Sequence, residues 1–282
     1  MNYIDRQFLL DESRDRTAIS PFLKWAGGKR WLFSRYRHLF PRDIETLIDP
    51  FLGGGSSFFY LRPKNAVLSD LNPDLINLYK LVRDEPRRIT RRLVRYHHAH
   101  SKSFFYKTRA TKPTSAIDRA AWLLYLNRTC WNGLFRVNLK GSFNVPIGTK
   151  DTVFTSIDEL DRASIALKRT TVISSDFEAV IDCAKMNDLI FADPPYFDKR
   201  SEPRFVKYNS NVFSWADQIR LRDALIRARS RGAKCFVTNA NHRSLISLYR
   251  DCGTIHKLKR QSVVSGSNKG RGIDIEILVE IS

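Results

Sequence analysis

Short apolar runs recur along the chain and predict the strands of a sheet. They lie at residues 45–51, 65–70, 170–174, 188–193, 234–239 and 274–281. Most of these runs are continuously apolar instead of alternating with polar residues, which is typical of strands that are buried on both faces of a mainly parallel sheet. The pattern therefore predicts an α/β fold.

Stretches with the apolar spacing of helices lie between the strand-like runs. Residues 214–231 predict a helix that opens with Ser214 and Asp217 at capping-box spacing and that Gly232 can end. A strand-like run follows at once. Strand, helix and strand in this order form the repeating unit of a doubly wound α/β fold.

The middle of the chain has a different pattern. Residues 83–112 hold ten Lys and Arg residues but two acids, and their apolar spacing predicts an amphipathic helix with a basic outer face. Residues 116–126 predict a buried helix, and residues 131–148 predict an exposed basic hairpin or loop. We expect residues 76–159 to form a mainly helical module inserted into the α/β domain.

The remaining residues complete this predicted organisation. Residues 21–75 and 160–282 are expected to form the α/β domain on either side of the insertion. Residues 1–20 are polar and charged without a clear period, which predicts a loosely held N-terminal arm.

The charge balance narrows the class of partner. The chain of 282 residues has 48 Lys and Arg residues against 29 Asp and Glu residues, a formal net charge of +19. Such an excess usually reflects a polyanionic partner, with nucleic acid as the first candidate and an anionic membrane surface as the second. Hydrophobic residues make up 43% of the chain, which excludes a wholly disordered protein.

Targeting segments and metal motifs are not evident in the sequence. No apolar run approaches the roughly 18–20 residues needed to cross a bilayer, and the N-terminus lacks the apolar core of a secretory signal. None of the four cysteines, Cys130, Cys183, Cys235 and Cys252, lies within four residues of another, so no zinc knuckle or CxxC pair is visible. We expect reduced thiols, a cytoplasmic protein and no metal site.

The segment DPFLGGGS indicates a cofactor site. An apolar strand ends at Asp49, and three glycines, Gly53 to Gly55, lead into a helix-like run. Glycines there let the backbone approach a ligand closely, and the helix start offers free N–H groups. Asp70 ends the next strand-like run, where an acid can hydrogen-bond ribose hydroxyls. The pair predicts an adenosine-containing cofactor, and the alternative is a tight structural turn.

The tetrapeptide DPPY indicates a site that acts on a base. A buried strand runs directly into Asp193, Pro194, Pro195 and Tyr196. The two prolines make the segment rigid, and ligands of such sheets bind beyond the carboxyl ends of the strands. A carboxylate and backbone carbonyls can accept hydrogen bonds from an exocyclic amine, while the aromatic ring stacks on a flipped-out base. The alternative is a chance tetrapeptide in a loop.

The segment FLKWAGGK near the start of the α/β domain adds a further candidate. Lys24, Trp25 and Lys29 offer two cations and a stacking ring around a flexible Gly-Gly backbone. The spacing differs from that of a P-loop, so an NTPase is not supported. Taken alone, the segment could also be a basic surface turn.

The motifs FLKWAGGK, DPFLGGGS, SDLN, NRTCWNGLFRVNLKGSFNVPIG and DPPY stand in this order. In this combination the chain resembles the DNA adenine-N6 methyltransferases of the Dam type, the D12 class, in the order of their alpha group. The resemblance covers about residues 21–282. It implies a seven-stranded, mostly parallel sheet flanked by helices, S-adenosylmethionine as cofactor, double-stranded DNA as partner, and methylation of adenine N6, typically within GATC.

The resemblance also implies roles for individual residues. Contacts with the cofactor are expected from Trp25, Lys29, Phe51, Gly53, Gly55, Asp70, Asp176, Phe177 and Asp193. The catalytic set is Asp193, Pro194, Pro195 and Tyr196. Contacts with DNA are expected from Lys24, Trp131, Asn132, Leu134, Arg136 and Pro146, which match recognition residues of the family. The basic middle segment adds Arg91 and Arg95, and Asn138 and Lys140 of the hairpin are expected to contact DNA as well.

Among these DNA contacts, Lys24 and Arg136 are expected to read guanine, because Lys and Arg match its acceptors in the major groove. Arg91 and Arg95 are expected to contact phosphates. The alternative for a single one of these residues is a solvated helix face, which explains the whole basic cluster less well. Position 131 is Trp where the family commonly has Tyr, and the segment after DPPY has a composition of its own.

Other functions remain open at this level. A non-catalytic DNA-binding regulator on a methyltransferase fold would bind DNA without S-adenosylmethionine. Methylation of RNA adenine or of a protein amide could use a similar tetrapeptide, and a basic helix could bind a membrane surface. A cytosine-C5 mechanism needs an activated cysteine nucleophile, and the chain has no Pro-Cys pair. A cognate restriction endonuclease that acts separately is a further expected partner.

Overall fold

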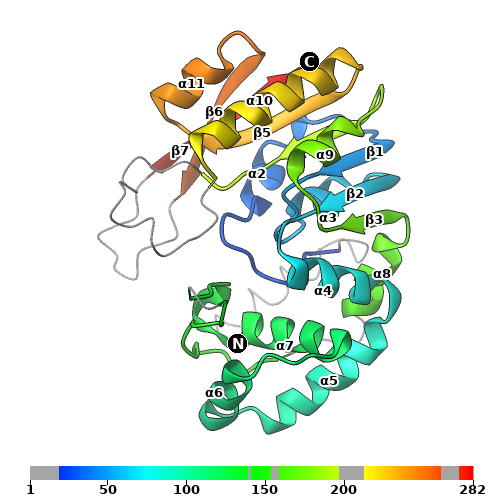
Figure 1. Cartoon of the computed structure of the whole chain (residues 1–282), viewed down its shortest axis with the longest axis vertical. Coiled ribbons are helices and arrows are strands. Elements are labelled where there is room, and N and C mark those ends of the chain that lie inside the picture. The colour runs from blue at the N-terminus through cyan, green and yellow to red at the C-terminus, as the bar shows by residue number, and fades with distance from the viewer. Residues whose placement is uncertain (1–18, 139–140, 154–158, 197–212, 262–272, 282) are drawn as a thin grey trace, which may run out of the picture.

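The computed structural model describes residues 19–138, 141–153, 159–196, 213–261 and 273–281. Its centre is a seven-stranded sheet in the order β3-β2-β1-β4-β5-β7-β6 (Figure 1). The strands are β1 Thr46–Asp49, β2 Asn65–Ser69, β3 Thr170–Ile173, β4 Leu189–Ala192, β5 Lys234–Ala240, β6 Thr254–Gln261 and β7 Ile273–Ile281. β1 to β5 are parallel, and β7 runs antiparallel between β5 and β6. The predicted fold class is confirmed.

Both faces of the sheet are buried, which explains why the strands are continuously apolar. Leu47 and Phe191 point into one core, while their neighbours Ile48 and Ile190 point into the other. The first core packs against α2 Arg30–Arg35 and α3 Ser56–Leu61, and the second against α9 Phe177–Asp182, α10 Trp215–Ser230 and α11 Arg243–Tyr249. Alternating side chains of each strand therefore serve opposite layers.

The strand β6 was not among the predicted runs. Its sequence is rich in basic side chains, and Leu258 is buried between the exposed Lys257 and Lys259. β6 lies at the edge of the sheet and pairs with β7 alone. Exposed lysines are common on edge strands because they discourage pairing with another chain.

The predicted helix over 214–231 is confirmed as α10. Ser214 caps it, and the side chains of Ser214 and Asp217 make both hydrogen bonds of a capping box. Gly232 follows the helix with a φ of +91°, a left-handed conformation that favours glycine.

A group of helices lies below the sheet in Figure 1. It comprises α4 Pro73–Asp84, α5 Pro86–Ala99, α6 Lys102–Ala110, α7 Ala116–Thr129 and α8 Glu159–Leu167. Two short 3-10 helices, which do not belong to this group, lie at Arg37–Leu39 and Trp131–Gly133. The expected single basic helix over 83–112 is instead the end of α4 followed by two helices. The helical path is interrupted before Ser101, whose side chain accepts a hydrogen bond from the Phe104 N–H and caps α6.

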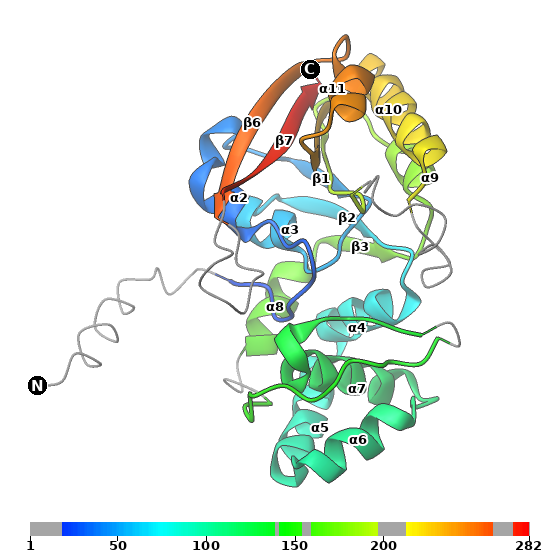
Figure 2. The same cartoon turned by 90° about the vertical axis from the view of Figure 1, so that its left-hand side faces the viewer.

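α7 is buried almost all round, as its sequence predicted. The segment 131–148 runs across it (Figure 2), and Phe143 makes an edge contact with Trp122 of α7. Bridges Cys130–Ile147 and Val137–Phe143 make this segment a hairpin. The boundaries at 76 and 159 of the inserted module stay a prediction, and most of the expected arm, residues 1–18, lies outside the described residues.

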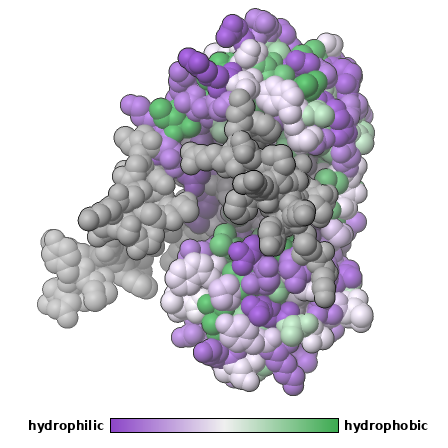
Figure 3. Space-filling model, turned by 60° about the vertical axis from the view of Figure 1, so that its left-hand side comes forward, coloured by the Kyte–Doolittle hydropathy of each residue, from purple (hydrophilic) through white to green (hydrophobic). Residues whose placement is uncertain are grey.

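None of the described helices is long and apolar enough to cross a membrane. Among the described residues that are visible in Figure 3, polar side chains dominate, with apolar ones scattered among them.

Candidate active site

A cavity of about 1070 Å³ opens at the carboxyl ends of β1, β2 and β4. Asp49 ends β1, Asp70 follows β2, and Asp193 follows β4, and all three line the cavity. β1 lies between β2 and β4. The strands that follow β1 in the chain are added first on its β2 side and then on its β4 side, so the strand order reverses at β1. Ligands of open α/β sheets bind at such a switch point.

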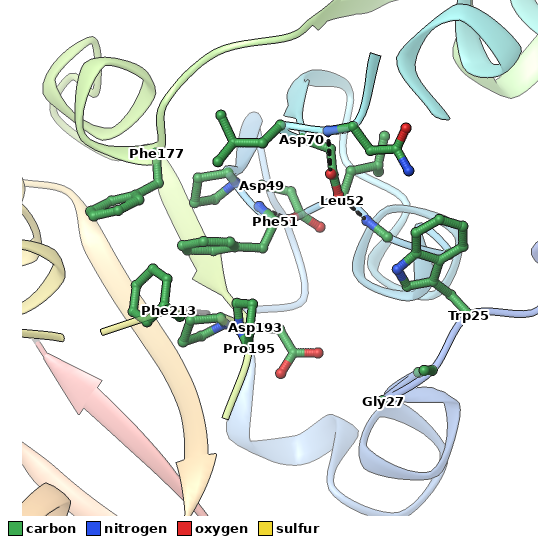
Figure 4. A pocket seen from close by; sticks show the side chains of 18 of the residues that line it. Trp25, Gly27, Asp49, Phe51, Leu52, Asp70, Phe177, Asp193, Pro195 and Phe213 are labelled. Carbon is green, nitrogen blue, oxygen red and sulfur yellow. Dashed lines mark hydrogen bonds between the residues drawn. The ribbon is translucent and has the colours of Figure 1, made fainter. Parts of the chain in front are cut away.

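The glycine loop is tied to Asp70. The carboxylate accepts a hydrogen bond of 3.0 Å from the Gly53 N–H and one of 2.9 Å from the Asn72 N–H (dashed in Figure 4). Gly53 has a φ of +46°, and a Cβ there would lie 2.8 Å from Cδ1 of Trp25. The loop therefore needs glycine both for its conformation and because the indole ring packs against it.

Asp49 is a buried carboxyl group beside this loop. It accepts a hydrogen bond of 3.0 Å from the Phe51 N–H and one from the Ser57 hydroxyl. Burial raises its pKa to about 7, against the opposing effect of these hydrogen bonds. Asp49 was expected to end the strand but was not named as a binding residue.

Three aromatic rings form one wall of the cavity (Figure 4). The ring of Phe51 lies 5.4 Å from that of Phe177 and 5.6 Å from that of Phe213, and Phe177 and Phe213 are 5.5 Å apart. Phe213 was not predicted, because it follows the tetrapeptide at a distance in a segment without a motif. Flat rings around one space suit a planar ligand.

Asp176 stands next to this wall but is already engaged. Its side chain accepts a bond from the Glu178 N–H and caps α9. It also forms an ion pair of 2.9 Å with Arg220, whose guanidinium lies over the ring of Phe177. The predicted cofactor contact of Asp176 stays a prediction, and in this structure its side chain holds the wall in place.

The tetrapeptide follows β4 directly, as the sequence predicted. Oδ1 of Asp193 accepts a hydrogen bond of 2.5 Å from the Thr238 hydroxyl and lies 2.8 Å from Nζ of Lys29. Burial raises the pKa of Asp193, while Lys29 and the Thr238 bond act in the opposite direction.

A second carboxylate completes this corner of the cavity. Glu276 accepts a bond of 2.5 Å from the Tyr196 hydroxyl and one of 2.9 Å from Arg260. The pKa of Tyr196 is raised well above its usual value by burial and by the two carboxylates, so the hydroxyl stays a donor. Nζ of Lys29 lies over the Tyr196 ring, 4.6 Å from its centroid. The five residues Lys29, Asp193, Tyr196, Arg260 and Glu276 are called the charged corner below.

The recognition hairpin starts beside the cavity. Trp25 stacks on Phe135 at 5.3 Å, which joins the cofactor loop to the hairpin. The Asn127 amide accepts a bond from the Lys24 N–H and donates to the carbonyls of Lys24 and Gly133. Asn127 was not predicted as a site residue, because a single Asn within a helical pattern forms no recognisable motif.

The predicted DNA residues are spread over this hairpin and α5. Trp131 and Leu134 are exposed although apolar, and Nε of Arg136 donates to Asn144 at 2.8 Å. Of the rest, Asn138 turns the hairpin by accepting from the Ser142 N–H, and the Pro146 carbonyl accepts from the Trp131 N–H. Asn132 is exposed in the 3-10 turn with a φ of +55°, and Lys140 lies outside the described residues.

Arg91 and Arg95 are exposed on α5, and neither lines the cavity. Lys24 is exposed too, and partial burial together with Lys150 lowers its pKa.

The structure brings nearly all the predicted cofactor and catalytic residues to one cavity. Its lining includes Trp25, Lys29, Phe51, Gly53, Asp70, Asp176, Phe177, Asp193, Pro194, Pro195 and Tyr196. Gly55 lies just behind it, at the start of α3 with a φ of +68°. Among the residues that the structure describes, no group of three His, Cys, Asp or Glu side chains could hold a metal ion.

Besides Asp49, Phe213 and Asn127, sequence reasoning missed three residues of the last three strands. Thr238 lies in β5, Arg260 in β6 and Glu276 in β7. Glu276 did leave a signal, because it is an acid inside the strand-like run at 274–281, followed directly by three apolar residues, Ile277 to Val279. A charge inside a buried strand calls for a buried partner.

Comparison with known proteins identifies the family. The model of the D12 class N6 adenine-specific DNA methyltransferases matches residues 25–264. The chain is 33% identical over 275 residues to the type II methyltransferase M1.LlaDCHI of Lactococcus lactis subsp. cremoris, covering 94% of this chain and 96% of that protein. It is 32% identical over 285 residues to the type II methyltransferase M.MjaIII of Methanocaldococcus jannaschii, covering 93% and 98%.

A DNA adenine methylase of Vibrio cholerae serotype O1 is 32% identical over 262 residues, covering 91% of this chain and 94% of that protein. The chain therefore belongs to the D12 class of N6 adenine-specific DNA methyltransferases, enzymes that act on DNA with S-adenosylmethionine as the methyl donor.

Proposed function

We propose that this enzyme methylates N6 of an adenine that has been flipped out of duplex DNA, within the sequence GATC. The observation that carries the proposal is the place of Asp193 and Tyr196 in the charged corner, on the same cavity as the aromatic wall and the glycine loop. The target sequence rests on the resemblance of the hairpin and on the relatives that are named DNA adenine methylases.

The cavity has the parts that S-adenosylmethionine needs. Each oxygen of Asp70 accepts one backbone hydrogen bond, so a further lone pair on each can accept a ribose hydroxyl. The rings of Phe51, Phe177 and Phe213 offer flat faces for the adenine. When bound, the cofactor supplies a methyl group on a sulfonium, which is open to attack by a lone pair.

Asp193 is suited to prepare that lone pair. Adenine N6 is a poor nucleophile, because its lone pair is delocalised into the ring. Within the described part of the chain, Oδ1 of Asp193 takes both side-chain contacts, so Oδ2 is left to accept one N6 hydrogen. The Pro194 carbonyl, held by a rigid backbone, accepts the other, and both bonds favour a tetrahedral nitrogen.

Lys29 supports this role of Asp193. Burial alone favours the neutral acid, and the ammonium group at 2.8 Å favours the ionised acceptor. Tyr196 presents the ring face away from Lys29 to the base, where stacking holds the adenine plane in line for transfer.

The hairpin would supply recognition of the sequence. Arg136 is oriented by Asn144, and a guanidinium with a set direction can bind a guanine edge through two bonds. Trp131 and Leu134 are exposed apolar side chains that can fill the space left by the flipped base. Arg91 and Arg95 would contribute contacts with phosphates, which add affinity without sequence information.

The named relatives also bear on the cellular role of the enzyme. Two relatives are named type II methyltransferases, which supports a modification enzyme whose cognate endonuclease acts separately. Because its substrate is genomic DNA, we place the enzyme in the cytoplasm.

The experiment that tests the proposal is transfer of labelled methyl groups from S-adenosylmethionine to three duplexes. One carries GATC, one carries GATC with N6-methyladenine on both strands, and one is mixed-sequence DNA without GATC. We expect label in the first duplex alone. Label in the mixed DNA would overturn the target sequence, and no label anywhere with intact DNA binding would favour the non-catalytic regulator.

A further inference from the structure

Glu276 is a buried carboxylate in an apolar strand. It is 6% exposed, and the residues after it in β7, Ile277 to Val279, are fully buried hydrophobic side chains. Its register partners are Ala240 at the carboxyl end of β5 and Leu258 of β6, so it lies beside the strand ends where the cavity opens. A buried charge is costly unless it is paired, so its partners explain its place.

Among the described residues, the partners of Glu276 are Tyr196, Lys29 and Arg260, all members of the charged corner. Oε2 accepts the bond of 2.5 Å from the Tyr196 hydroxyl and lies 3.8 Å from Nζ of Lys29. Oε1 accepts the bond of 2.9 Å from Arg260. One carboxylate thus contacts the stacking ring, the cation beside Asp193 and a second cation.

The charges balance only when Glu276 is included. Lys29 and Arg260 carry two positive charges, while Asp193 supplies one negative charge. Without Glu276, one positive charge of Lys29 and Arg260 would be left uncompensated, and Lys29, which is 3% exposed, would be shared between fewer carboxylates. Lys29 would then weaken the Asp193 carboxylate as a hydrogen-bond acceptor, because it draws on the same negative charge that the N6 hydrogen must find.

The hydroxyl bond also decides where the Tyr196 ring lies. The backbone of Pro194 and Pro195 is rigid, but the ring can still turn about its own side-chain bonds. The ring is held at two points, by Lys29 over one face and by Glu276 at the hydroxyl tip. Loss of the tip contact frees the ring while the backbone stays in place.

We propose that Glu276 is a positioning residue for methyl transfer: it holds the Tyr196 ring at its stacking position and keeps the Lys29–Asp193 pair in charge balance. This inference rests on the proposed function, since it assigns the ring to the flipped adenine. Glu276 acts through Tyr196 and Lys29 and makes no contact with substrate itself.

The test compares three variants. Glu276→Gln keeps the size and an acceptor oxygen but removes the charge, Glu276→Leu removes both, and Tyr196→Phe removes the hydroxyl alone. Glu280→Gln is the matched control, because it makes the same change in the same strand at a carboxylate paired with His256 at the far end from the cavity. S-adenosylmethionine affinity and thermal melting are measured for all four.

Two readouts separate positioning from a merely structural role. The first is the single-turnover rate of methyl transfer to a GATC duplex. The second is the fluorescence of 2-aminopurine in place of the target adenine, which reports how closely the flipped base stacks on the ring. We expect Glu276→Leu and Tyr196→Phe to slow transfer by about 10- to 100-fold and to raise the emission, as expected for a misplaced reactant.

Further outcomes sharpen the assignment. The double variant of Glu276→Leu and Tyr196→Phe should be slowed less than the product of the single effects, because both changes remove one shared bond. Glu276→Gln should slow transfer while leaving emission close to that of the wild type, and the control should change neither readout.

The inference fails if Tyr196→Phe leaves rate and emission unchanged, and this variant keeps the test decisive even if the Glu276 variants do not fold. It also fails if folded Glu276→Leu transfers methyl groups at the wild-type rate. If wild-type protein transfers no methyl group to adenine, the proposed function fails instead, so the two failures are distinguishable.

Discussion

The aromatic wall and the charged corner lie on the same cavity but are held together by different forces. The wall consists of three apolar rings, and the glycine loop beside it is tied to Asp70 by a backbone N–H group. The corner consists of four charged side chains and Tyr196, joined by ion pairs and side-chain hydrogen bonds. Packing of apolar rings holds the wall together, and compensation between opposite charges holds the corner together.

This difference predicts how each region responds to change. A ring or a loop can lose a contact and keep much of its function, because dispersion contacts are many and individually small. A buried network of charges depends on every member, since removal of one leaves another without compensation. Changes in the corner should therefore affect the chemical step, and changes in the wall should affect binding and stability.

The largest expected effect is that of Asp193→Ala. The change removes the acceptor for the N6 hydrogen and leaves Lys29 without its closest partner, so we expect the single-turnover rate to fall by about 10²–10⁴-fold. Binding of S-adenosylmethionine, measured by calorimetry, should change far less. Asp251→Ala at an exposed site serves as control. A variant that methylates at the wild-type rate would remove the assigned mechanism.

The second prediction concerns the glycine loop beside the wall. A Cβ on Gly55 would lie 2.6 Å from the Tyr79 hydroxyl, and its φ of +68° is strained for any other residue. We expect Gly55→Ala to lower the free energy of unfolding by about 2–4 kcal/mol, measured by chemical denaturation. Gly141→Ala is the control, because its φ of +73° is similar while the space around it is open. Equal losses in both variants would show that crowding contributes nothing.

A smaller effect should follow from Asp49 at the border of the two regions. Its pKa is raised to about 7, so the folded protein holds this proton more tightly than the unfolded chain does. The resulting contribution to stability is fully present below the pKa of the unfolded chain. It is lost as pH rises through 7. Binding of a cationic sulfonium ligand favours the ionised form. The affinity for S-adenosylmethionine should therefore rise with pH by up to about tenfold per unit below 7 and level off above it.

Calorimetric titration from acidic to mildly alkaline pH measures this dependence. Asp49→Asn should bind the cofactor with an affinity that hardly varies over the same range. If the variant keeps the pH dependence of the wild type, another group is responsible for it.

The smallest expected effect lies outside the cavity. Arg91→Ala should weaken binding of every duplex by a similar small factor and reduce the salt dependence by about one counterion. Arg136→Ala, in contrast, should reduce the preference for GATC by about 1–3 kcal/mol. Fluorescence anisotropy with matched and mismatched duplexes at several salt concentrations measures both. Loss of preference in Arg91→Ala would move the reading of sequence to α5.

Much of the fold could be predicted because burial on both faces leaves a clear pattern. Six strands were found as apolar runs, and the capping box of α10 was found from two residues, Ser214 and Asp217. The edge strand β6 could not be found in this way, because basic residues on both sides of Leu258 interrupt any apolar run. The break between α5 and α6 depends on Ser101, the N-cap of α6. A single Ser within a continuous basic stretch is too weak a signal to divide the predicted helix.

The candidate site divides along the same line as the two regions. The glycine loop and DPPY are continuous segments whose chemistry depends on local backbone geometry, so the sequence shows them directly. Phe213, Thr238, Arg260 and Glu276 carry no such motif, because each acts through a side chain that only folding brings to the cavity.

By itself, the sequence determined the layered α/β architecture, the cofactor loop, the DPPY segment and the family, since hydrophobic period and local turn geometry are properties of neighbouring residues. The tertiary structure alone decided that Lys29 stands between Asp193 and Glu276, that Asn127 joins Lys24 to the hairpin, and that three rings close one wall. These contacts join segments far apart in the chain. Their energy comes from burial and mutual compensation of charge, which exist only once the sheet has placed its strands side by side.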